Sequence, residues 1–217
     1  MTAGGTTGGR RRGRPPDSDS ADTHRAILDA GRRLFAARGY SGVTNKDVAE
    51  AVGLTTSSLY HYVASKLDLY VEIDIDTQRR VYDRFRLAVR SEASFLGKLF
   101  AVLDAADALN RSDPSMSAFV GMVRVDMRQH PEIAERLAFQ SKEREEFFLG
   151  LADVGLESGE IAPEHRAMVI AFIRTVFLGL TEGSTTPDRY HCSIEAVKQV
   201  LCGGLVTPLP VEPSLGS

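Results

Sequence analysis

Cysteine and long apolar runs are scarce in this chain of 217 residues, and each shortage excludes a class of protein. The only two cysteines, Cys192 and Cys202, fit neither a disulfide framework nor a zinc ligand set, so we expect free thiols in a reducing compartment. No apolar run approaches the roughly 18 residues that cross a bilayer, and the first residues lack the apolar core of a signal peptide. We therefore expect a cytoplasmic protein with no membrane partner.

The usual sequence patterns of an enzyme are also missing. There is no phosphate-binding loop, no glycine-rich nucleotide fingerprint and no paired metal-ligand spacing, so we expect no cofactor and no metal. Ser57 and His61 lie four positions apart on one helix face and could be taken for a nucleophile and its base. The serine lacks a nucleophile elbow, however, and no acid is specified to orient the histidine. We therefore predict that the protein is not an enzyme.

Charge is divided unevenly along the chain. Residues 1–66 hold ten Lys or Arg against six Asp or Glu, whereas the remainder holds 16 against 23. A basic N-terminal part suggests contact with a polyanion, and an acidic remainder suggests a separate task. The length allows a small head and one larger domain. We predict a disordered basic arm at 1–21, a DNA-binding head at 22–67, a helical domain at 68–207 and a disordered tail at 208–217.

The segment from Thr44 to Leu69 has the pattern of a helix-turn-helix. Val48 and Ala49 share one face of a first short helix, and Gly53 permits a tight turn and a close crossing of two helices. Thr44 with Asp47 forms a variant of the capping box, and Thr55 or Thr56 can cap the second helix. Upstream, the apolar positions from Ala26 to Phe35, closed by Gly39, outline a third helix.

The second helix of this unit directs hydroxyl-bearing side chains outward, where they can bond phosphates or base edges. It contains no Arg or Lys, so bidentate reading of guanine by this helix is not available. We predict that the major groove is read by Thr55, Thr56, Ser57 and Ser58, that Tyr60, His61 and Lys66 hold the DNA backbone, and that Leu59 is buried support.

A basic arm precedes the head. Arg12 and Arg14 flank Gly13 in a segment that resembles an AT-hook core, in which arginines enter a narrow minor groove. The alternative interpretation is a solvated basic tail with only a general attraction to phosphate. An architectural minor-groove protein that uses this arm is the main alternative function, but it would leave the long acidic domain without a role.

These residues resemble the TetR/AcrR family of bacterial one-component regulators. The resemblance covers residues 22–70, and two positions depart from the usual pattern: Ser57 replaces glycine or alanine, and Val63 replaces phenylalanine. It implies that Thr44 contacts a DNA phosphate, through its backbone or its hydroxyl. It also implies an all-α fold of about nine helices and a homodimer that binds a palindromic operator on double-stranded DNA. The expected function is a ligand-responsive regulator, more often a repressor than an activator.

Helical patterns fill the rest of the chain, and no convincing strand alternation is present. We expect helices at about 66–89, 95–106, 115–128, 131–156, 163–181 and 193–206. The last two are apolar over much of their circumference. A buried core would explain this, but the resemblance implies that they pair across a two-fold axis. The expected interface residues are Phe172, Val176, Phe177, Val197 and Leu201.

Bulky apolar residues between the head and these two helices could line an effector cavity, although a packed core is an equal alternative for each. The candidates are Phe100, Leu103, Met116, Phe119, Met122, Val123, Phe147 and Phe172. Polar residues such as Arg124 and Asp126 could orient a ligand. Composition favours an apolar or amphipathic small molecule, whose identity the sequence does not specify.

Overall fold

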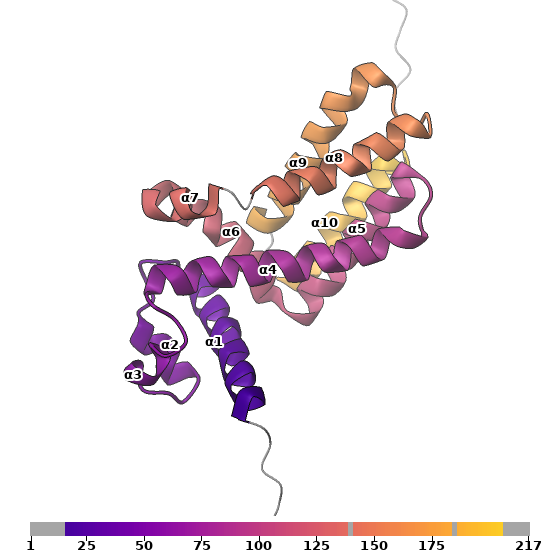
Figure 1. Cartoon of the computed structure of the whole chain (residues 1–217). Helices are drawn as coiled ribbons and strands as arrows, with labels where there is room; N and C mark the ends of the chain where they lie inside the picture. Colours follow the sequence, from indigo (N-terminus) through magenta and orange to yellow (C-terminus); the bar gives the residue numbers. More distant parts are fainter. Residues whose placement is uncertain (1–15, 139–140, 184–185, 206–217) are drawn as a thin grey trace, which may run out of the picture.

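The structure is a computed structural model that describes residues 16–138, 141–183 and 186–205. In these residues the chain forms ten α-helices and two short 3₁₀ turns, without a β-strand (Figure 1). The all-α expectation is therefore confirmed. None of the helices in these residues is both long and apolar enough to cross a membrane.

The first three helices form the head. They are α1 (Pro16–Arg38), α2 (Asn45–Ala51) and α3 (Thr56–Leu59). Thr44 and Asp47 form the expected capping box of α2, and Thr55 rather than Thr56 caps α3 by accepting the backbone N–H of Ser58. The N-cap residues Thr44 and Thr55 therefore set the start of both short helices.

Two glycines make the turns of the head. Gly39 and Gly53 have φ of 68° and 70°, a left-handed conformation that glycine adopts without steric cost. A Cβ on Gly53 would have no heavy atom within 4 Å. The expected close helix crossing at Gly53 is therefore wrong, because the turn requires this glycine for its backbone conformation alone.

Helix α4 (Lys66–Ala88) joins the head to the larger domain and runs along both (Figure 1). The other helices are α5 (Phe95–Ser112), α6 (Pro114–Gln129), α7 (Pro131–Leu137), α8 (Ser141–Glu157), α9 (Arg166–Gly183) and α10 (Pro187–Leu201). Because α4 begins at Lys66, the proposed boundary at residue 67 falls inside one continuous helix. Motion of this helix would therefore involve both parts of the molecule.

The core has two apolar clusters. One fills the head with Ile27, Phe35 and Leu59 and extends to Phe119 of α6 and Ile133 of α7. The second lies in the larger domain and is built from α4, α5, α8, α9 and α10. Burial of these side chains drives the assembly of each cluster. The head core is therefore completed by residues more than 50 positions further along the chain.

Three boundaries differ from expectation. The segment 131–156 is two helices, because Ile133 and Leu137 of α7 pack on the head cluster whereas Phe148 and Leu151 of α8 pack in the second cluster. Helix α10 begins at Pro187 rather than 193, because proline is favoured at the first helical position and Thr186 caps the helix. Helix α1 begins at Pro16, so residues 16–21 are helical and not part of a disordered arm.

Candidate DNA-reading head and ligand cavity

Helix α3 (Thr56–Leu59) carries the predicted DNA-reading residues. Leu59 is fully buried as predicted, while Thr55, Ser57, Tyr60 and His61 are exposed. The Thr55 Oγ1 accepts the Ser58 N–H at 3.1 Å and lies 2.8 Å from the Ser58 hydroxyl oxygen. Thr56 and Ser58 are half-buried. The helix is therefore anchored by Leu59 and directs hydroxyl groups toward solvent, and two of these hydroxyls, those of Thr55 and Ser58, are hydrogen-bonded to each other.

Tyr60 extends from the end of α3 and is 52% exposed. The Nδ2 of Asn45, the first residue of α2, donates to the Tyr60 hydroxyl oxygen at 3.2 Å. A phenol that accepts this bond keeps its own O–H free to donate to a phosphate oxygen. Sequence reasoning missed Asn45, because its contact with Tyr60 depends on how α2 and α3 cross.

The two donors of Thr44 are both used inside the capping box. Its N–H donates to Asp47 Oδ2 at 2.7 Å, and its hydroxyl donates to the same oxygen. The side-chain and backbone bonds from Thr44 lower the pKa of Asp47. The predicted donation from Thr44 to a DNA phosphate would have to compete with these bonds.

Lys66, which was predicted to contact the DNA backbone, makes its contacts within the head. Its Nζ donates to the carbonyl oxygens of Tyr40 and Val43, at 3.0 and 3.2 Å, and lies 4.1 Å from the centre of the Tyr40 ring. This geometry favours a role in fixing the turn between α1 and α2 over the predicted contact with the DNA backbone. Arg12 and Arg14 of the basic arm lie outside the described residues.

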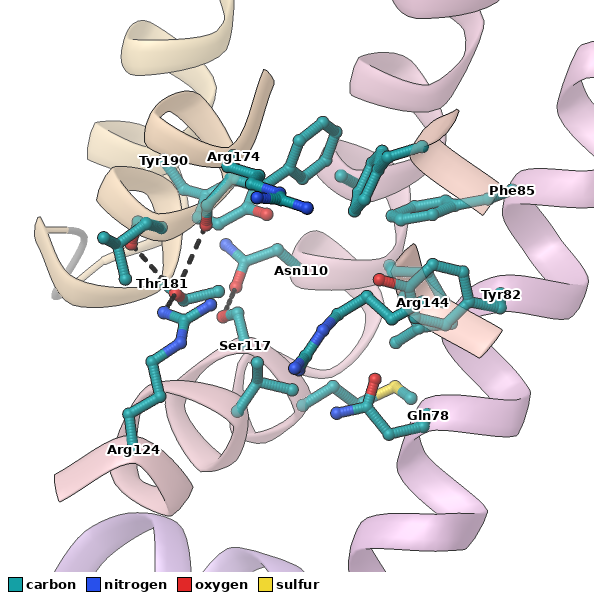
Figure 2. Close-up of a pocket in the computed structure, with 18 of the residues that line it drawn as sticks. Gln78, Tyr82, Phe85, Asn110, Ser117, Arg124, Arg144, Arg174, Thr181 and Tyr190 are labelled. Atoms are coloured by element: carbon teal, nitrogen blue, oxygen red, sulfur yellow. Dashed lines mark hydrogen bonds between the residues drawn. The ribbon is translucent and has the colours of Figure 1, made fainter. Parts of the chain in front are cut away.

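A cavity of about 440 Å³ lies in the larger domain, lined by residues of α4, α5, α6, α8, α9 and α10 (Figure 2). This volume is in the usual range for small-molecule sites. Its apolar wall is formed by Tyr82, Phe85, Phe148 and Phe177, whose rings belong to one network of contacts with centroids 5.0–6.2 Å apart. The cavity could therefore receive an apolar group against an aromatic surface.

Three arginines line the same cavity from three helices, namely Arg124 of α6, Arg144 of α8 and Arg174 of α9. Figure 2 shows the side chains of Arg144 and Arg174 reaching into the space between the helices. Arg174 forms an ion pair with Glu145, and Arg124 donates to the hydroxyl of Thr181. Burial lowers the pKa of Arg124, as does the neighbouring positive charge of Arg144.

The cavity differs from the predicted pocket in most of its residues. Of the eight candidates only Met116 lines it, and Met122 lines a second, neighbouring cavity. Phe119 and Val123 are buried in the head cluster, Leu103 and Phe100 belong to the second core cluster, and Phe147 packs beside Phe148. Phe172 is 38% exposed on the surface of α9. Most of these side chains are therefore packed core, the alternative that sequence patterns could not exclude.

The predicted interface residues lie on α9 and α10 but have different surroundings. Val176, Val197 and Leu201 are half-buried against the second core cluster, and Phe177 lines the cavity. Phe172 is exposed, together with Met168 and Leu178 of α9 and Val200 of α10. These two helices therefore leave apolar side chains uncovered in the single chain.

The head and the cavity are connected through α6. Asp126, near the end of α6, accepts the Tyr40 N–H at 2.9 Å and the Tyr70 hydroxyl at 2.7 Å. The Ser41 hydroxyl oxygen lies 2.8 Å from His130 Nε2, at the end of the same helix. Two residues before Asp126, Arg124 lines the cavity. A displacement of α6 at the cavity would therefore act on the turn that precedes α2.

Two features would indicate metal binding or catalysis in the described residues, namely a cluster of metal ligands and a hydrogen-bonded serine–histidine pair. No group of three or more His, Cys, Asp or Glu residues there could hold a metal ion. Ser57 of α3 and His61, which follows this helix, are both exposed, and the structure shows no hydrogen bond between these two residues.

Comparison with known proteins supports the assignment of the head. Residues 27–73 match the family described as bacterial regulatory proteins, tetR family. The HTH-type transcriptional repressor KstR2 of Rhodococcus jostii is 27% identical over 151 residues, which are 67% of this chain and 72% of that protein. The segment 27–73 that matches the family contains the second half of α1, all of α2 and α3, and the start of α4.

Solved structures show the same fold over most of the chain. The transcriptional regulator FadR of Bacillus subtilis, in complex with stearoyl-CoA, superposes with a TM-score of 0.67 at 19% identity, covering 84% of this chain and all of that one. AibR in complex with isovaleryl coenzyme A and operator DNA gives 0.63 at 19% identity, covering 82% and 97%. The helix-turn-helix and the family match lead to one conclusion: the head of this chain belongs to the tetR family of bacterial regulatory proteins, and the chain is a DNA-binding transcriptional regulator.

Proposed function

We propose that the protein is a homodimeric repressor that binds a palindromic operator and releases it when a small molecule occupies the cavity. The observation that carries this proposal is the continuity of α4 and α6, each of which packs on the head and also lines the cavity. The names of related proteins support it, since KstR2 is a repressor and AibR was solved with both a coenzyme A ester and operator DNA.

In this proposal the head reads DNA with α3. Thr56, Ser57 and Ser58 face the base edges of the major groove, and Tyr60 and His61 hold the backbone on either side. Substitution of Thr56 or Ser57 would then change base preference, whereas loss of a backbone contact would weaken all sequences alike. Two heads related by a two-fold axis read two half-sites about one helical turn apart, or a multiple of it.

The proposed dimer forms through α9 and α10. Met168 and Phe172 of α9 and Val200 of α10 are large apolar side chains exposed in the single chain. Exposed apolar groups gathered on two neighbouring helices favour burial against a second copy, as in a four-helix interface. A symmetric interface of this kind places the two heads on the same face of the DNA.

The ligand acts in this proposal by favouring one spacing of the two heads. A ligand shifts an equilibrium only by its difference in affinity for the two states. The cavity includes Gln78 and Tyr82 of α4, and Tyr70, two turns earlier on that helix, packs in the head cluster. Ligand contacts that move α4 or α6 would therefore be transmitted to α2 and α3.

The experiment that tests the proposal is selection of bound sequences from a random duplex library, with the oligomeric state measured on the same sample. The full chain is compared with a variant that lacks residues 1–15, which leaves α1 complete. An enriched palindrome bound by a dimer in both variants is the expected result. A monomer, or A/T-rich enrichment that disappears with the arm, would contradict the proposal and favour an architectural minor-groove protein.

The same truncated variant also tests the basic arm, when its binding to the selected sequence is measured at several salt concentrations. If Arg12 and Arg14 enter the minor groove, truncation removes an A/T preference beside the palindrome and reduces the salt dependence of binding by about one unit for each lost phosphate contact. An unchanged salt dependence would show that the arm does not contact the DNA.

A further inference from the structure

The charges that line the cavity are unbalanced. Its lining holds three arginines and one carboxylate, that of Glu145, which is paired with Arg174. Arg124 donates only to the neutral hydroxyl of Thr181. Arg144 has neither a hydrogen bond nor an ion pair with any residue that the structure describes. Two positive charges therefore remain without a paired anion in a partly enclosed space.

Two more distant carboxylates do not remove this imbalance. Asp74 of α4 interacts electrostatically with Arg144 but does not line the cavity and forms no ion pair with this arginine, and its Oδ1 accepts a hydrogen bond from Gln78 at 3.4 Å. Glu182 acts on Arg124 from the end of α9 without forming an ion pair. Like charges in a partly buried site repel each other more strongly than in water. A ligand with an acidic group would relieve this repulsion.

One wall of the cavity is apolar and aromatic. Tyr82 and Phe85 of α4 face Phe148 of α8 and Phe177 of α9 within the ring network of the cavity. Arginine guanidinium groups bind carboxylates and phosphates through paired N–H donors, whereas aromatic rings hold hydrocarbon. The cavity therefore combines the two chemistries of an amphiphile in one site.

We propose that the effector is an acidic amphiphile, whose carboxylate or phosphate binds Arg144 and the adjacent Arg124 while its apolar body lies against the aromatic wall. This inference rests on the proposed function, because it names the ligand class of the same cavity. Neutral apolar molecules of equal size would leave the two guanidinium groups unpaired. Cationic amphiphiles would add a further positive charge.

A series of ligands with one alkyl chain and different head groups tests this inference without DNA. Dodecanoate, dodecyl phosphate, dodecanol and dodecyltrimethylammonium are titrated into the full protein below their micelle concentrations, and binding is measured by calorimetry. Dodecanoyl coenzyme A and free coenzyme A are added to separate a coenzyme A ester from a free acid. The expected result is that the anions bind at least about tenfold more tightly than dodecanol and that the cation does not bind.

Variants then locate the preference. Arg144→Gln should reduce the affinity for dodecanoate and dodecyl phosphate about tenfold and leave the affinity for dodecanol unchanged, and Arg144→Lys should restore part of the loss. Arg79→Gln is the matched control, because Arg79 is an exposed arginine of α4 outside the cavity. Thermal unfolding of each variant confirms that it is folded.

Two results would overturn the inference. One is a dodecanol affinity equal to that of the anions in the unchanged protein, and the other is an anion preference that survives in both Arg144→Gln and Arg124→Gln. Tight binding of dodecanoyl coenzyme A alone would assign the acidic group to the nucleotide part of the ligand. Since these titrations contain no DNA, their failure is separate from a failure to find an operator or a dimer.

Discussion

The reading head and the ligand cavity differ in how far apart in the sequence their parts lie. The head's predicted DNA-contacting residues, apart from the arm, fall between Thr44 and Lys66, and their local geometry is set by caps and a glycine turn. The cavity takes residues from Gln78 to Tyr190 on six helices. The head is thus a locally specified surface, whereas the cavity exists only when distant helices assemble.

The largest expected effect comes from removing the buried arginine that joins α1 of the head to the start of α6, the helix that also lines the cavity. Arg32 of α1 is 1% exposed and binds Asp29, Ser115 and Asp113, the residue that caps α6. Arg32→Met would leave these carboxylates without their buried partner and should lower the free energy of unfolding by about 3–5 kcal/mol. Urea unfolding measures it, with Arg33→Met on the exposed face of α1 as the control. A similar cost for both variants would refute the role of Arg32.

The next test concerns Asp74 of α4, the helix that lines one side of the cavity. Burial raises the pKa of the Asp74 carboxyl group from 3.8 to about 6. A carboxyl with a raised pKa binds its proton more tightly in the folded protein, so its contribution to stability is complete below pH 3.8 and is lost as the pH rises through about 6. Asp74→Asn should therefore stabilise the protein at pH 7, by at most about 3 kcal/mol, and the gain should disappear near pH 4.

Thermal or urea unfolding at several pH values measures this effect of Asp74→Asn. Asp83→Asn on the exposed side of α4 is the control, because the Asp83 side chain is 65% exposed. A gain that does not change between pH 4 and pH 7 would contradict the assignment of the effect to the Asp74 proton.

Substitutions at two glycines should have smaller effects on the free energy of unfolding, and they compare a turn of the head with a helix of the larger domain. Gly53 of the head has a φ of 70°, whereas Gly150 is a helical residue of α8, and neither has a heavy atom within 4 Å of the position of a Cβ. Gly53→Ala should destabilise the protein by about 1–2 kcal/mol through backbone strain. Gly150→Ala should stabilise it by about 0.5–1 kcal/mol through helix propensity. Urea unfolding of both variants measures these effects. A stabilising effect of Gly53→Ala would show that the turn does not need the left-handed conformation.

The smallest expected effect concerns DNA affinity. Tyr60→Phe removes the hydroxyl that Asn45 holds and should weaken binding by about 0.5–1.5 kcal/mol, to the same extent on operator and on random DNA. Asn45→Ala should have a similar but smaller effect and none in the Tyr60→Phe background. Equilibrium binding of both single variants and the double variant measures the coupling. Additive losses would mean that Asn45 does not act through Tyr60.

Local features were the predictable part of this protein. Thr44, Asp47 and Gly53 carry their structural roles in their own chemistry, since caps and left-handed turns depend on neighbouring residues alone. The N-terminal ends of most helices were predicted for the same reason. The pocket was poorly predicted because Phe119 and Phe148 have the same apolar character, and only packing places one in the head core and the other at the cavity.

The sequence by itself determined an all-helical chain with a helix-turn-helix and the faces of its helices that avoid water. The tertiary structure alone decided which arginines face each other, where Asn45 meets Tyr60 and which aromatic side chains border open space. The physical reason is range: capping and periodicity act over three or four residues, whereas a cavity and its charges arise from the crossing of helices that are distant in the chain.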